Sequence, residues 1–83
     1  MNTDKAIIIL KMHKTGESFD VEIPLDITAN ELIIGLNKAY DLGMNTEDII
    51  HCFLRAENPI ALLKGNKKLS DFGIRNATVI NIK

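Results

Sequence analysis

The stretch Ile27–Gly43, ITANELIIGLNKAYDLG, carries a complete set of helix signals. Thr28, followed by Glu31 three residues later, predicts a capping box, in which each side chain accepts a hydrogen bond from the other residue's backbone amide. The apolar residues that follow recur at helical spacing and predict one buried stripe, made of Leu32, Ile33, Leu36, Ala39 and Tyr40. Gly43 is expected to end the helix in the left-handed conformation.

A single helix of this length cannot bury its apolar stripe alone, so the rest of the chain must supply an opposing layer of strands. Lys5–Met12 is rich in isoleucine and predicts a central strand with both faces against other side chains. Ser18–Ile23 alternates apolar and polar residues and predicts its hairpin partner. Gly16 lies in the intervening turn, and Pro24 is expected to end the second strand.

Three more strands are expected after the helix, at Ile49–Leu54, Ile60–Leu63 and Thr78–Ile82. Lys67–Ile74 contains a Ser-Asp pair that predicts a single turn of 3₁₀ helix. The order is β-β-α-β-β-β, and the last strand is expected to run parallel to the first. This is the β-grasp arrangement, a two-layer α+β fold with one helix across a mixed sheet, and it predicts a single domain over residues 1–83.

The composition excludes several classes of function. A net charge of −1 argues against a nucleic-acid-binding face, and a single cysteine, Cys52, allows no internal disulfide. The apolar run near the start of the chain is too short and wrongly flanked for a signal peptide or a membrane span. We therefore expect a cytoplasmic protein that does not insert into the membrane.

No set of residues predicts an enzyme, a cofactor, a metal site or a small-molecule substrate. His51 and Cys52 are neighbours on a predicted strand, so their side chains point to opposite faces and cannot form a nucleophile-base pair. Cys52 is expected to be buried and His51 half-exposed. Glu47 and Asp48 lie in a polar connection, where solvation is the expected state. His13 and His51 would lack a third metal ligand.

Gly35 lies inside the predicted helix, where glycine costs about 1 kcal/mol relative to alanine. Three explanations are open: close approach of another element, simple tolerance, or a flat patch for a partner. Tyr40, near the end of the same helix, is expected to cover the edge of the core.

The segment Leu69–Ile74, LSDFGI, resembles the LSDYNI signature of ubiquitin. Thr15-Gly16 and Thr28 also fall where ubiquitin has a Thr-Gly turn and a threonine cap. The sequence is most similar to the bacterial YukD family, whose members end in a KLSDxGIxxGDxLxI-like stretch. The matching residues are Lys68, Leu69, Ser70, Asp71, Gly73, Ile74, Ile80 and Ile82, whereas Asn76–Thr78 depart from the family's Gly-Asp turn.

The resemblance implies a cytosolic accessory or regulatory factor of the Gram-positive type VII (Ess/ESX-like) secretion machinery. Its partner would be a protein, such as a membrane component or ATPase of that machinery. Because no terminal Gly-Gly follows Ile82-Lys83, conjugation and sulfur transfer are not expected. The alternative interpretation is a small ubiquitin-like subunit of a multicomponent enzyme such as an oxygenase.

Ubiquitin-like modules commonly bind partners through the exposed face of the sheet. The residues expected to point outward there, and to contact a partner, are Met12, Cys52 or Leu54, Lys64 and Val79. The facing of the third strand is open by one residue, and a slip of one residue would exchange its two sets of side chains. An edge strand that accepts a partner strand is a second possible mode of binding.

Overall fold

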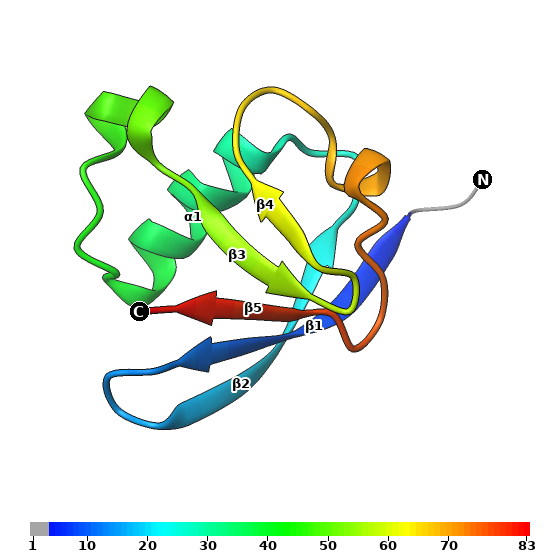
Figure 1. The fold of residues 1–83 in the computed structure, drawn as a ribbon, viewed down its shortest axis with the longest axis horizontal. Helices are drawn as coiled ribbons and strands as arrows, with labels where there is room; N and C mark the ends of the chain where they lie inside the picture. The colour runs from blue at the N-terminus through cyan, green and yellow to red at the C-terminus, as the bar shows by residue number, and fades with distance from the viewer. Residues whose placement is uncertain (1–3) are drawn as a thin grey trace.

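The fold is a mixed five-stranded sheet with one helix packed across one face, as predicted (Figure 1). The computed structural model describes residues 4–83, so residues 1–3 of the predicted domain lie outside the described residues. In chain order the elements are β1 (Lys5–Met12), β2 (Glu17–Pro24), α1 (Ala29–Tyr40), η1 (Thr46–His51), β3 (Leu54–Glu57), β4 (Ala61–Leu63), η2 (Leu69–Phe72) and β5 (Val79–Ile82), where η marks a 3₁₀ helix.

The strands are arranged in the order β2-β1-β5-β3-β4. β1 and β5 run parallel with Leu10 opposite Ile80, which confirms the predicted pairing of the first and last strands. The other three pairs are antiparallel. The carboxyl ends of β1 and β5 therefore lie at the same edge of the sheet as the start of β3.

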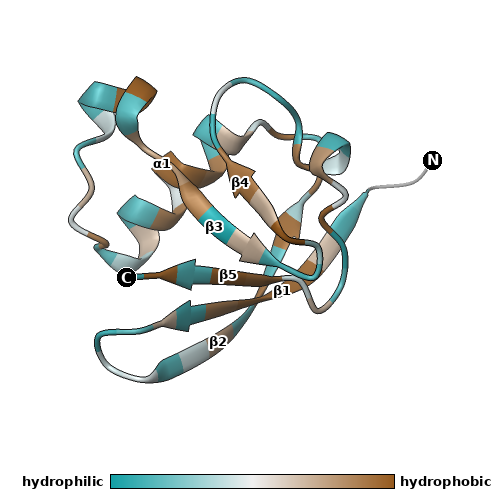
Figure 2. Cartoon of the chain, viewed as in Figure 1, coloured by the Kyte–Doolittle hydropathy of each residue, from teal (hydrophilic) through white to brown (hydrophobic). Residues whose placement is uncertain are grey.

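The core lies between α1 and the sheet. It contains Ala6, Ile8 and Leu10 from β1, Leu32, Ile33 and Leu36 from α1, and Leu54, Leu63 and Ile80 from the later strands. Hydrophobic and hydrophilic residues alternate along β3 (Figure 2). Because successive side chains of a strand point to opposite faces, this alternation puts one face on the helix and leaves the other open.

The expectation that β1 is covered on both faces is wrong. Ile8 is fully buried, whereas Ile7 is 51 % exposed on the opposite face and Ile9 is half-buried. β1 is central in the order of strands, but the single helix covers one side of the sheet only. An unbroken apolar run therefore does not require two covering layers.

The start of α1 is as predicted. The Glu31 amide donates to Thr28 Oγ1 at 3.1 Å, and the Thr28 amide donates to Glu31 Oε1 at 2.9 Å. The end of the helix differs, because Asp41 takes the left-handed conformation first, with φ 53°, and its amide bonds to the carbonyl of Asn37. Gly43 is also left-handed, with φ 74°, but lies two residues beyond the cap.

The third strand begins later than predicted. Most of the segment Ile49–Leu54 belongs to η1 or to its end, and only Leu54 lies in β3. Asn45 starts η1 by accepting the Glu47 amide on its side chain, and the Cys52 amide closes it on the carbonyl of Ile49. These local hydrogen bonds override the strand preference of the two isoleucines.

Gly35 lies on the exposed side of α1, and an added Cβ would meet nothing within 4 Å. Close approach of another element is therefore excluded as its explanation. Gly35→Ala is expected to stabilise the fold by about 0.5–1 kcal/mol, because alanine loses less backbone entropy in a helix. Urea denaturation measures the change.

Gly43→Ala is the matched control, because Gly43 has a positive φ and alanine is strained there. We expect this variant to lose about 1 kcal/mol. If Gly35→Ala were destabilising, helix propensity would not be the dominant effect at that position.

Candidate functional site

Two of the four predicted contact residues lie on the wrong side of the sheet. Leu54 is 3 % exposed and pairs with buried Leu63, and Met12 is half-buried against the same core. Both prove to be on the helix side: the even-numbered residues of β1 face α1, and Leu54 starts β3 facing inward. Cys52, the other candidate on this segment, is also buried.

Lys64 and Val79 are at least partly accessible to solvent, but they lie on different segments of the chain. Lys64 is exposed immediately after β4, and Val79 is half-buried on the open face in β5. The sheet therefore does not unite the four residues into one surface. A role for Lys64 or Val79 in binding stays a prediction.

The register of the strands defines what the open face presents. One row of paired residues crosses all five strands and reads Ser18, Lys11, Asn81, Arg55 and Leu62. The next row reads Asp20, Ile9, Val79 and Glu57. The first row is therefore polar and charged across its middle, whereas Ile9 and Val79 stand in the middle of the second row. The exposed apolar side chains of this face are Leu62 on β4 and Ile7 on β1.

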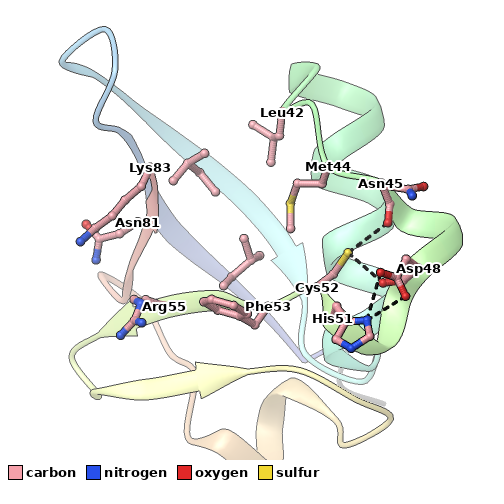
Figure 3. Close-up of a pocket in the computed structure, with 12 residues that line it drawn as sticks. Leu42, Met44, Asn45, Asp48, His51, Cys52, Phe53, Arg55, Asn81 and Lys83 are labelled. Atoms are coloured by element: carbon pink, nitrogen blue, oxygen red, sulfur yellow. Dashed lines mark hydrogen bonds and ion pairs between the residues drawn. The ribbon is translucent and has the colours of Figure 1, made fainter.

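Two grooves lie on either side of a ridge formed by Arg55, Asn81 and Lys83. The first, of about 580 Å³, lies between the loop after α1 and the adjoining ends of β3 and β5 (Figure 3). We call it the terminal groove. The second, of about 530 Å³, lies on the open face and is lined on its far side by Ile60 and Leu62.

The terminal groove has apolar walls and a polar rim. Its apolar lining is formed by Leu42, Met44, Cys52, Phe53, Leu54 and Ile82. Arg55, Asn81 and Lys83 lie on one side of the opening, and Asn45, Asp48 and His51 lie on the other (Figure 3). The Arg55 guanidinium lies 5.5 Å from the centre of the Phe53 ring, within the range of a cation–π contact.

His51 and Cys52 do not form a catalytic pair. Cys52 is buried, and its thiol donates to the backbone carbonyls of Asn45 and Asp48 at 3.3 and 3.6 Å. The His51 imidazole is 78 % exposed and its Nδ1 lies 2.9 Å from Asp48 Oδ1. The predicted burial of Cys52 is confirmed, but His51 is more exposed than expected, since η1 rather than a strand carries it.

Three of the exposed apolar side chains lie beside the two grooves, and none of the three was predicted as a contact residue. Ile60 is 91 % exposed at the turn between β3 and β4, Leu62 is 47 % exposed on β4, and Phe53 is 42 % exposed beside β3. The alternation of Leu62 with buried Leu63 could have indicated one of them. The pattern does not predict the exposure of Phe53, because Phe53 belongs to the predicted strand Ile49–Leu54, whose facing is open by one residue.

Other predicted features have simple structural roles. Tyr40 packs against Phe19, with ring centroids 5.5 Å apart, at the edge of the core as expected. The Lys67 ammonium, two residues before the start of η2, lies 4.8 Å from the centre of the Phe72 ring. Within residues 4–83, no three potential metal-ligating side chains cluster. No helix in that range combines the length and apolar character needed to cross a bilayer.

The family is shown by a match over almost the whole chain. A family model described as "WXG100 protein secretion system (Wss), protein YukD" matches residues 7–82. The chain belongs to the YukD family. The resemblance seen in its sequence is thus confirmed, and this YukD-family protein is a ubiquitin-like protein associated with that secretion system. No match was found among curated protein sequences.

Solved structures confirm the ubiquitin-like fold of this YukD-family protein. The ubiquitin-like domain of tubulin-binding cofactor B is 19 % identical, with a TM-score of 0.73 over 96 % of this chain and 89 % of that one. The C-terminal ubiquitin-like domain of mouse tubulin-specific chaperone e is 11 % identical, with a TM-score of 0.70 over 99 % and 88 %. The UBL domain of Plasmodium falciparum Dsk2 is 20 % identical, with a TM-score of 0.60 over 99 % and 100 %.

Proposed function

We propose that this YukD-family protein is a non-conjugated cytoplasmic adaptor of a Gram-positive type VII (Ess/ESX-like) secretion system. It acts as one ubiquitin-like domain that binds another protein of the machinery, a membrane component or its ATPase. The family match over residues 7–82 carries this proposal. Ubiquitin-like domains generally mediate protein–protein interaction, and the two grooves beside Arg55 offer surface for such binding.

The proposal is tested by affinity capture from the native host. The tagged full-length chain is crosslinked in living cells, the membranes are dissolved in detergent, and the retained proteins are identified by mass spectrometry. We expect a membrane component or ATPase of the secretion machinery to be enriched over an unrelated ubiquitin-like bait that carries the same tag.

Three results would contradict the adaptor role. Capture of oxygenase-type subunits would favour the enzyme-subunit alternative. A covalent adduct through the carboxyl end of the chain would indicate conjugation. Capture without any secretion component, repeated with secretion active, would remove the proposed partner class.

A further inference from the structure

The apolar walls of the terminal groove are left accessible by the fold. Leu42, Met44 and Ile82 pack against the core but remain partly exposed, and Phe53 is 42 % exposed at the rim. A volume of about 580 Å³ lies within the range of ligand pockets. The groove is nevertheless an open depression that adjoins the second groove across Arg55 and Lys83, so its shape suits a chain segment better than a compact molecule.

The charges around the terminal groove are unequal. Within residues 4–83, no lysine or arginine lies within 4.0 Å of an acidic side chain, and the one acidic side chain that lines the groove, Asp48, contacts His51. No acidic side chain in this range lies within 4.0 Å of the charged groups of Arg55 or Lys83. Lys11, paired with Asn81 in register, adds a further cation beside them. The side of the groove formed by β3 and β5 therefore carries positive charges that no acidic side chain within residues 4–83 neutralises by direct contact.

We propose that the terminal groove binds an acidic segment of a partner protein that carries at least one large apolar side chain. The apolar side chain packs between Met44, Phe53 and Ile82, and neighbouring carboxylates bind Arg55 and Lys83. This inference rests on the proposed adaptor function and specifies the chemistry of its partner. An apolar anchor with a complementary charged rim is the arrangement that gives most protein interfaces their affinity and specificity.

The distribution of acidic residues favours a peptide over a nucleic acid or a lipid surface. Asp48 lies in η1 on the far side of the groove, and Glu47 precedes it in the same 3₁₀ helix. A peptide can present its carboxylates to Arg55 and Lys83 alone, whereas a phosphate chain carries a charge on every unit and would be repelled by η1. The overall charge of −1 also disfavours a polyanionic surface.

A phage-displayed library of random twelve-residue peptides, selected on the folded full chain, provides the probe. We expect the selected peptides to be enriched in Asp and Glu beside Leu, Ile or Phe. Their binding should shift the NMR signals of the groove residues. It should also weaken about tenfold or more in Phe53→Ala and in Arg55→Glu.

Matched controls separate the groove from general effects of surface change. Ile50→Ala removes a 69 % exposed apolar side chain from η1 outside the groove, and Lys14→Glu reverses an exposed charge in the β1–β2 turn. Both should bind as the unchanged protein does, and all four variants should melt within a few degrees of it. Enrichment of basic or uncharged peptides, or equal losses in variants and controls, would overturn the inference.

Two further measurements distinguish this inference from the adaptor proposal. If secretion components are captured equally by the Phe53→Ala and Arg55→Glu baits, the adaptor role stands and the groove is not its site. If the selected peptides bind the groove but no secretion component is captured, the groove chemistry stands and the adaptor role fails. Groove-dependent binding of an oligonucleotide or of anionic lipid vesicles, in place of acidic peptides, would also overturn the inference.

Discussion

Leu54→Asp is expected to unfold the protein rather than to disrupt a binding surface. Leu54 is 3 % exposed and packs in the core beside Leu63. The substitution removes a buried leucine and places a carboxylate in the same apolar site, at an expected cost of about 4–5 kcal/mol or more. The total stability of an 83-residue chain is about 4–12 kcal/mol. Circular dichroism should show a lost or strongly lowered thermal transition.

The neighbouring residue supplies a matched control. Arg55 follows Leu54 in β3 and its side chain is exposed. Arg55→Asp removes the contact with Phe53 and places a poor strand former in β3, so it should lower the free energy of unfolding by only about 1–2 kcal/mol. Equal stability of Leu54→Asp and the unchanged protein would mean that β3 is shifted by one residue. The comparison also prevents a loss of partner capture in Leu54→Asp from being interpreted as evidence for a contact.

Much of the fold could be predicted because its signals are local and strong. The capping box at Thr28 and Glu31 depends on residues close in sequence and forms as predicted. The turn of 3₁₀ helix at η2 also forms where it is expected, although its N-cap, Lys68, makes no side-chain hydrogen bond and the Ser-Asp pair does not cap it. The parallel pairing of β1 with β5 then followed from the order of elements. The start of β3 was predicted too early, because Asn45, Glu47 and Asp48 form the capped, acidic first turn of a 3₁₀ helix, and this local signal outweighs the strand preference of Ile49 and Ile50.

The wrong start of the third strand explains why Leu54 was wrongly predicted as a contact residue and why the terminal groove was not predicted. A strand over Ile49–Leu54 would allow Leu54 to face the open side of the sheet. It would also leave no place for η1 and the loop before it, which form one side of the terminal groove. Met12 was misplaced for another reason, since the run of isoleucines in β1 obscured which residues face the helix. A groove between three segments far apart in sequence needs tertiary structure to be seen at all.

Thr78 is the buried polar residue that ties the β3–β4 turn to the start of β5. Its side chain is fully buried, and its hydroxyl donates to the carbonyl of Asn58 at 2.7 Å. The same oxygen accepts the Arg75 amide at 3.0 Å. The Arg75 guanidinium also donates to Asn58 Oδ1 at 2.8 Å. The turn that carries exposed Ile60 is thus held to the sheet through one hydroxyl and one guanidinium.

Thr78→Val is expected to destabilise the protein by about 1–3 kcal/mol, although it preserves the shape of the side chain. The valine leaves the Asn58 carbonyl and the Arg75 amide without their partner, and an unsatisfied buried group costs that amount. Thr78→Ser keeps the hydroxyl and loses one methyl group, worth about 0.8 kcal/mol, so it should be the milder change. Urea denaturation gives both values, and amide hydrogen exchange at Arg75 should quicken in the valine variant alone. If Thr78→Ser lowered the free energy of unfolding as much as Thr78→Val, packing of the Thr78 methyl group rather than its hydroxyl would be what holds the turn.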